Sequence, residues 1–138
     1  MKIKMIVFAV LLSIIPTVCM ASDVVVIANK SVSDTALTKN DLSKIYLGKK
    51  STWSDGNKIN FVILSGDLQD NFLENYVGKS KSQFDMFWKK QIFTGKGKPP
   101  KELNSDQAMV DYIAQTAGAI GFVSASADLS KVKTISLK

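Results

Sequence analysis

The stretch LSKIYLGKKSTWSDG, residues 42–56, decides the fold. Its apolar residues recur at helical spacing as far as Tyr46, and Gly48 stands where a helix often ends in the left-handed conformation that glycine adopts without steric cost. A Ser-Asp-Gly-Asn turn follows, and we expect Trp53 to fill the core beside the helix. A second informative stretch is GAIGFV, residues 118–123, in which a glycine also borders an apolar run.

The helix predicted by this stretch has a well-marked start. Thr38 is expected to cap it, Asp41 occupies the acidic position of a capping box, and Leu37 and Leu42 have the spacing of a hydrophobic staple. Residues 24–28 lie upstream, beyond a polar turn, and form a continuous apolar run rich in β-branched residues. Such a run is typical of a strand that is buried on both faces.

Two more helices are predicted after a strand at residues 59–64. Asp67 is expected to cap the first of them, and Gly78 is expected to end it. Ser80 and Gln83 have the spacing of a capping box at the start of the next helix. The apolar stripe of that helix is predicted to lie in the core and consists of Phe84, Phe87, Trp88 and Ile92.

The last part of the chain predicts one more helix and two strands. Asn104 and Gln107 have capping-box spacing, and Gly118 is expected to end the helix that follows them. Residues 120–123 and 132–137 are expected to form the closing strands. The order of all these elements predicts an α/β fold, with a central mixed β-sheet flanked by helices on both faces.

The residue types that the chain lacks exclude most enzymes. Its 138 residues include no His and a single Cys, so catalytic triads, Cys–His pairs and histidine-based metal sites are excluded. We therefore expect no catalytic residue, no metal and no cofactor, and a protein that is not an enzyme. All 18 basic residues are Lys, and the absence of Arg argues against nucleic acid as a partner.

The N-terminus predicts export. Lys2 and Lys4 precede an apolar run at residues 5–15, Pro16 breaks the run, and Ala21 closes a small-residue site of the kind that signal peptidase cleaves. The alternative is a transmembrane anchor, which needs about 20 apolar residues, and this run is shorter. We therefore expect a periplasmic or secreted protein.

Cleavage at this point defines the domain organisation. Residues 1–21 form the expected signal peptide, and residues 22–138 form one domain of common size. The mature part has no cysteine, so its stability depends on burial rather than on disulfides. Cys19 raises a lipoprotein alternative, although Val18 occupies a position where lipidation signals usually have Gly, Ala or Ser.

The stretches at residues 42–56 and 118–123, in this order, resemble segments of the phosphate-type substrate-binding proteins of bacterial ABC transporters, a type 2 periplasmic-binding-protein-like family. That family carries I-[FY]-L-G-K…W-x-D-G and, later, G-A-I-G-[YF]-V. The resemblance covers residues 37–123 and implies a single periplasmic-binding-protein-like lobe, because the chain is too short for the family's two lobes. It further implies a small oxyanion such as phosphate as ligand, and an ABC transporter membrane component or another envelope protein as partner.

The resemblance also locates the candidate ligand site. Family members bind their oxyanion through backbone N–H groups and hydroxyls at helix starts, with help from an Arg. When the pattern is anchored on Phe72, residues 68–70 replace the usual Ser-Gly-Thr, and no Arg is present. Asp70 would then either repel an anion or accept a hydrogen bond from hydrogen phosphate. The candidate ligand-binding residues are Ser31, Ser33, Ser65, Gly66 and Asp70.

A second class of function stays open at this point. The lobe could have kept its fold and lost its ligand, and serve as a cell-envelope adaptor that binds another protein. Its contact surface would be an exposed apolar groove or the loop at residues 96–101, which contains three Lys and otherwise has the composition of a solvated loop. Calorimetry with phosphate separates the two classes.

Overall fold

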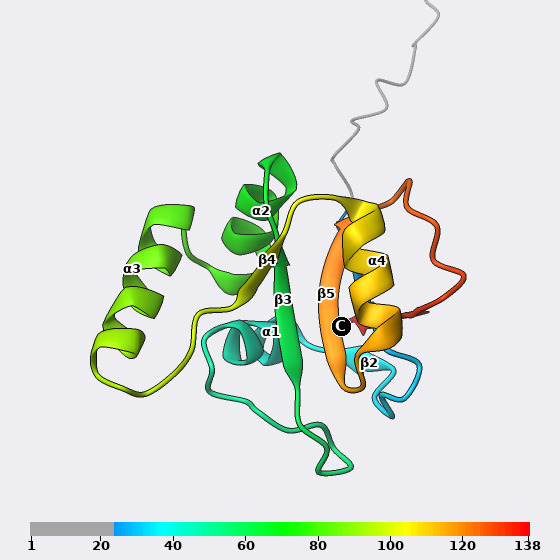
Figure 1. The fold of residues 1–138 in the computed structure, drawn as a ribbon, viewed down its shortest axis with the longest axis horizontal. Helices are drawn as coiled ribbons and strands as arrows, with labels where there is room; N and C mark the ends of the chain where they lie inside the picture. Colours follow the sequence, from blue (N-terminus) through cyan, green and yellow to red (C-terminus); the bar gives the residue numbers. More distant parts are fainter. Residues whose placement is uncertain (1–23) are drawn as a thin grey trace, which may run out of the picture.

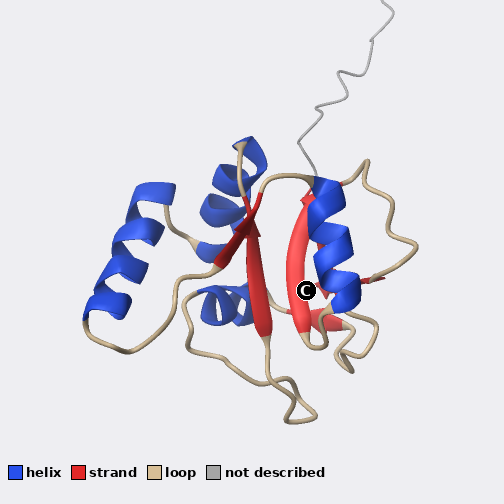
Figure 2. Ribbon diagram, in the orientation of Figure 1, coloured by secondary structure: helices blue, strands red, loops and turns tan. Residues whose placement is uncertain are grey.

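A five-stranded mixed sheet lies at the centre of the computed structural model, which describes residues 24–138 (Figures 1 and 2). The strand order is β4-β3-β5-β1-β6, and a second, two-stranded sheet pairs β2 with β7. The strands are β1 (Val24–Ala28), β2 (Ala36–Leu37), β3 (Asn60–Leu64), β4 (Lys101–Leu103), β5 (Ala119–Ser124), β6 (Lys133–Thr134) and β7 (Ser136–Leu137). The expected signal peptide, residues 1–21, lies outside the described residues.

The directions of the strands decide where their ends lie. β3 runs parallel to both of its neighbours, β4 and β5. β1 runs antiparallel to β5, with Val24 opposite Ser124 and Ala28 opposite Ile120. The carboxyl ends of β3, β4 and β5 therefore meet at one edge of the sheet, whereas the carboxyl end of β1 lies at the other edge.

Helices cover both faces of the sheet, as the order of elements predicted. They are α1 (Lys39–Tyr46), α2 (Asp67–Phe72), α3 (Lys81–Phe93) and α4 (Asp106–Gln115), and a π-helical turn, η1 (Leu73–Val77), continues α2. α4 packs against β5 and β1 in front of the sheet in Figure 1, whereas β3 passes in front of α1. α3 extends away from the sheet at the side of β4. Within residues 24–138, no helix is long and apolar enough to cross a membrane.

The alternation of side chains along β5 explains how the two layers pack. Phe122 points toward α1 and α2, where its ring stacks on Phe72 with centroids 3.9 Å apart. Gly121 lies on the face of β5 that packs against α4, and a Cβ added there would lie 2.5 Å from the sulfur of Met109. Glycine at this position thus lets α4 approach the strand closely.

Most of the predicted helix ends are confirmed. Thr38 and Asp41 form a capping box at the start of α1, and Ser80 and Gln83 form one at the start of α3. The helix that starts at Thr38 ends at Gly48, whose φ of 72° is left-handed. Gly78 and Gly118 have similar values of φ, 76° and 72°. The strand predicted at residues 24–28 is β1 without change, and Trp53 is buried, with 2% of its surface exposed.

Two predicted caps are wrong by one residue. Gly66, rather than Asp67, is the N-cap of α2, because the turn after β3 has a φ of 100° there, which only glycine adopts readily. Ser105, rather than Asn104, caps α4, and its hydroxyl accepts a hydrogen bond of 3.1 Å from the backbone N–H of Ala108. In both cases the true cap and the predicted cap are adjacent residues of types that commonly cap helices, Gly66 with Asp67 and Ser105 with Asn104. Spacing in the sequence alone therefore did not separate the two candidates.

The remaining corrections concern the edges of the fold. Residues 101–103 form the edge strand β4, where the sequence predicted a loop. Residues 132–137 form two short strands, because the chain bonds to β1 as far as Ile135, whose N–H donates to the carbonyl of Val26, and then pairs with β2 from Ser136 onward. In α3, the predicted core stripe is only partly buried: Phe84 and Trp88 are buried, whereas Ile92 is 44% exposed because α3 stands away from the sheet.

Candidate functional site

The predicted ligand-binding residues lie at opposite edges of the central sheet. Ser31 and Ser33 follow the carboxyl end of β1, and the backbone N–H of Asn29 bonds to Ala119 at the start of β5. Ser65, Gly66 and Asp70 follow the carboxyl end of β3. Five residues of extended strand separate the two edges, about 16 Å. A single small oxyanion cannot contact both groups.

The edge that holds Ser31 and Ser33 has its polar groups already paired. The hydroxyl of Ser31 accepts a hydrogen bond of 3.3 Å from the backbone N–H of Gly118, and the backbone N–H of Ser31 donates to the side chain of Asn29. Ser33 is exposed and its hydroxyl contacts Asp34 and Ser54. A pocket of about 290 Å³ opens beside Ser31, with one lysine and one carboxylate among its lining residues. These contacts are those of a hydrogen-bonded turn.

The edge that holds Ser65 has a hydroxyl without a protein partner. The backbone N–H of Ser65 donates to the carbonyl of Leu103, but within residues 24–138 no group bonds to its half-buried side-chain hydroxyl. Gly66 starts α2 without any side-chain cap, so the first N–H groups of that helix have no side-chain acceptor. Donors at this turn are therefore available to an external acceptor.

Two further serines of the same edge were not predicted. Ser105 caps α4 and is the second residue after β4, and Ser124 ends β5. The parallel register pairs Leu64 with Leu103 and Phe61 with Ile120, and when it is continued it brings Ser65 level with Ser124 and one residue short of Ser105. Serines thus lie at or just beyond the carboxyl ends of three parallel strands, the edge at which open α/β sheets bind ligands. For Ser124, the signal in the sequence was a serine directly after a predicted strand; Ser105 offered no such signal, because β4 was not predicted.

The charges at this edge are mostly negative. Asp106 accepts hydrogen bonds from both the backbone N–H and the hydroxyl of Ser124, and that hydroxyl also lies 2.9 Å from the hydroxyl of Ser126. Asp67 and Asp70 lie in the first turn of α2. The neighbouring cation is Lys81, whose pKa is raised mainly by its hydrogen bond to Asp85, with a smaller contribution from Asp70. An anion at this edge would therefore meet helix N–H groups and serines, but also carboxylates.

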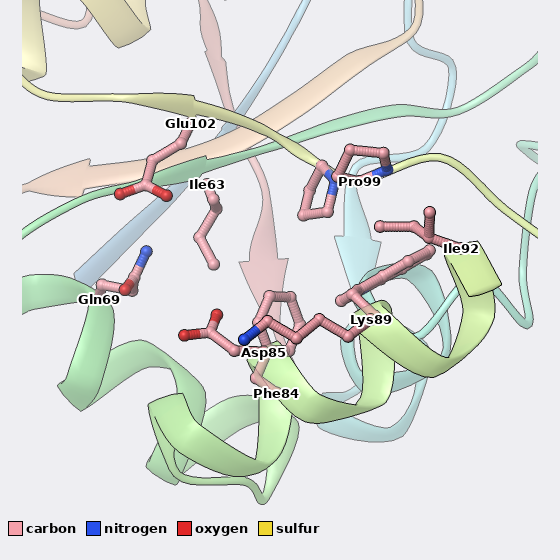
Figure 3. A pocket seen from close by; sticks show the side chains of 10 residues that line it. Ile63, Gln69, Phe84, Asp85, Lys89, Ile92, Pro99 and Glu102 are labelled. Carbon is pink, nitrogen blue, oxygen red and sulfur yellow. The ribbon is translucent and has the colours of Figure 1, made fainter.

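An apolar groove of about 190 Å³ separates α3 from β4 (Figure 3). Phe84 and Ile92 contribute apolar surface, whereas Asp85 and Glu102 place two carboxylates near Gln69 at one end. Lys89 also lines the groove, but the two carboxylates outnumber it, so the groove is a poor site for an anion. Within the described part of the chain, no three His, Cys, Asp or Glu residues gather in a way that could hold a metal ion.

Comparisons with known proteins agree with this architecture. A family model described as a PBP superfamily domain matches residues 9–137. Among solved structures, an ABC-type phosphate transport receptor from Vibrio cholerae is 20% identical, with a TM-score of 0.57 over 83% of this chain and 45% of that one. PstS from Borrelia burgdorferi is 17% identical, with a TM-score of 0.61 over 83% of this chain and 47% of that one.

A third structure shows the same relationship. A protein described as a phosphate ABC transporter substrate-binding protein, with phosphate bound, from Clostridium perfringens is 18% identical, with a TM-score of 0.67 over 83% of this chain and 44% of that one. At these identities the likeness shows the fold alone; the Vibrio cholerae protein is described as a transport receptor and the Clostridium perfringens protein as a substrate-binding protein. The chain spans less than half the length of each of these structures. No curated protein matches the chain.

Proposed function

The chain belongs to the PBP superfamily, and we propose that it is an exported solute-binding lobe whose solute is a small oxyanion such as phosphate. Two structures with the same fold are described as a phosphate transport receptor and a phosphate ABC transporter substrate-binding protein, and the second of them has phosphate bound. The proposal extends that ligand class to this chain. Such a lobe binds and presents a solute and performs no catalysis.

The proposal rests on the hydroxyl of Ser65, which has no hydrogen-bond partner within residues 24–138, and on the start of α2 beside it, where Gly66 provides no side-chain cap. A helix start presents N–H groups with no intrahelical acceptor, and the helix dipole favours an anion there by about 0.3–1 kcal/mol. α2 continues without interruption into η1, so the dipole is that of the whole helical segment 67–77. Ser65 and Gly66 are therefore the proposed ligand contacts of this edge.

The carboxylates near this edge limit the affinity of the proposed site for an anion. At about 5 Å and an effective dielectric constant of about 20, one carboxylate repels each unit charge of the ligand by roughly 3 kcal/mol. Asp70 is exposed, so solvent and salt reduce this figure. We therefore expect weak binding that favours the singly charged form of phosphate over the doubly charged form. Ser31 and Ser33, at the other edge, are not part of this site.

A partner is part of the proposal. The residues of this chain match less than half of each phosphate-receptor structure, so one lobe of such a protein is matched rather than the whole. We propose that a second copy of the chain, a membrane component of an ABC transporter or another envelope protein contacts this lobe. A periplasmic location, after removal of residues 1–21, follows from the same proposal.

Isothermal titration calorimetry with phosphate tests the proposal. Wild-type protein is expected to bind phosphate, and Ser65→Ala is expected to weaken binding about threefold to tenfold, the usual loss for one hydrogen bond. Ser82→Ala is the matched control, because Ser82 is an exposed serine on α3. Both variants should keep the wild-type melting temperature, because neither hydroxyl forms a hydrogen bond with another group of residues 24–138.

Two outcomes contradict the proposal. If no heat is observed with phosphate in the millimolar range, the lobe does not bind this oxyanion, and the ligand-free adaptor becomes the better account. If phosphate binds equally well to wild type and Ser65→Ala, the ligand site lies elsewhere on the molecule.

A further inference from the structure

A basic hollow of about 420 Å³ lies along the amino-terminal half of β3. Its walls come from the loop after α1 and from the loop that joins α3 to β4, and Figure 1 shows both loops beside β3 at the end away from α2. Neither Asp nor Glu is among its lining residues. We call it the lysine hollow after its five basic residues, Lys50, Lys58, Lys96, Lys98 and Lys101.

The shape of the lysine hollow depends on a buried tryptophan. Trp88 is 7% exposed, and its indole N–H donates a hydrogen bond of 3.1 Å to the carbonyl of Tyr46. Gly48 and Gly97 pack on its ring so closely that a Cβ would lie 3.1 Å and 3.0 Å from it. Because Gly97 is held against the ring, the flanking residues Lys96 and Lys98 belong to an anchored loop.

The charges of the lysine hollow are largely unneutralised. Lys50 lies 4.0 Å from Asp41, and the ammonium group of Lys101 lies 5.0 Å from the ring centre of Tyr112. Within residues 24–138, no ion pair engages Lys58, Lys96 or Lys98. Like charges that share one concave surface repel each other, and a ligand with several negative charges relieves that repulsion.

We propose that the lysine hollow binds a soluble anion that carries two or more phosphate groups. Lysine is a compact and flexible point charge that binds phosphate oxygens without requiring a fixed planar geometry. Lysines on two separate loops require an anion whose charges are spread over more than one group. Trp88 is buried and Tyr112 is covered by Lys101, so neither ring is free to stack on a nucleobase.

This site is distinct from the edge at Ser65. The lysine hollow lies at the other end of β3, so its ligand does not depend on whether phosphate binds at the start of α2. Its contacts are solvated ion pairs, and binding should therefore weaken as salt is added.

Calorimetry of the mature protein with tripolyphosphate and with orthophosphate tests the proposal. At low salt, we expect tripolyphosphate to bind at least about tenfold more tightly, because it contacts several lysines at once. The variant Lys58→Gln/Lys96→Gln/Lys98→Gln should lose about tenfold in affinity for tripolyphosphate and should show a weaker dependence on salt. Its melting temperature should not fall, since no ion pair is removed.

A variant of equal charge provides the control. Lys39→Gln/Lys90→Gln/Lys131→Gln removes three exposed lysines that do not line the hollow, and it should bind tripolyphosphate nearly as well as wild type. Equal losses in both triple variants would show a general effect of net charge and overturn the proposal. So would equal affinities for the two phosphates, or binding to vesicles rich in phosphatidic acid without binding to soluble tripolyphosphate.

Discussion

The indole N–H of Trp53 donates a hydrogen bond of 3.0 Å to the carbonyl of Gly118, a residue 65 positions further along the chain. The bond joins the two stretches of sequence that decide the fold, residues 42–56 and 118–123. The same carbonyl accepts a second bond of 3.1 Å from the backbone N–H of Asn60, at the start of β3. The turn before β5 is thus fixed to the first helix–turn segment and to the central strand.

Replacement of Trp53 should destabilise the fold. Trp53→Ala is expected to lower the free energy of unfolding by about 3–5 kcal/mol, because it removes a large buried side chain. Trp53→Phe should cost less, about 1–2 kcal/mol, since Asn60 still bonds to the carbonyl of Gly118. Urea denaturation measures both values. An unchanged stability together with lost ligand binding would instead make Trp53 a functional residue.

Two left-handed glycines should respond differently to the same change. At Gly118, a Cβ would lie 2.2 Å from the carbonyl oxygen of Lys58, whereas at Gly56 it would meet no atom within 4 Å. Gly56→Ala should therefore cost only the strain of its backbone conformation, about 1–2 kcal/mol. Gly118→Ala adds a clash with rigid backbone and should cost at least about 2 kcal/mol more. Similar melting temperatures for the two variants would contradict this account.

The capping box of α1 should make stability depend on pH. The pKa of Asp41 is lowered, mainly because the backbone N–H of Thr38 donates to its carboxylate. A lowered pKa in the folded state means that the charged form contributes stability above the unfolded pKa of about 3.9, and that this contribution is lost as the pH falls through the folded pKa.

Asp41→Asn isolates this contribution. At neutral pH, the variant should be less stable than wild type by about 0.5–1 kcal/mol, a typical value for a charge at a helix start. The difference should shrink as the pH is lowered through about 4 and below. Thermal unfolding at a series of pH values measures it. A difference that stayed constant over this range would mean that the charge of Asp41 does not matter.

Export should leave a mature protein that begins at Ser22. The basic start, the apolar run at residues 5–15 and the small residue Ala21 predict cleavage there. Intact-mass measurement on periplasmic or secreted material tests this. A mass that includes Met1, or a lipid attached to Cys19, would contradict it.

Local signals predicted the helices well because capping is a short-range interaction. Thr38 with Asp41, and Ser80 with Gln83, bond to the backbone within three residues, so spacing in the sequence suffices to find them. β4 escaped prediction for the opposite reason. It is a three-residue edge strand with two exposed charged residues. Its composition therefore does not predict a strand, and only the pairing with β3 in the folded chain defines it.

Strand direction explains why the predicted site divided into two. The sequence predicted one ligand site that combined Ser31 and Ser33 with Ser65, Gly66 and Asp70. Composition does not say which way a buried strand runs, and β1 proved antiparallel to β5 while β3 is parallel to it. The lysine hollow was missed for a similar reason, because Lys50 and Lys58 join the loop at residues 96–101 only in the folded chain.

The carboxylate of Asp70 should decide the affinity for phosphate. It lies in the first turn of α2, close to the N–H groups that the proposed site offers, and it is exposed. We expect Asp70→Asn to tighten phosphate binding severalfold, because the amide removes a negative charge near an anion. The gain should be larger at about pH 8 than at about pH 6, since phosphate carries more charge at the higher pH. Asp34→Asn, at the opposite edge of the sheet, is the matched control and should leave the affinity for phosphate unchanged at both pH values. Weaker binding by Asp70→Asn would show instead that the carboxylate accepts a hydrogen bond from hydrogen phosphate. The reason is that the amide of Asn has an NH₂ donor where the carboxylate of Asp has an acceptor oxygen.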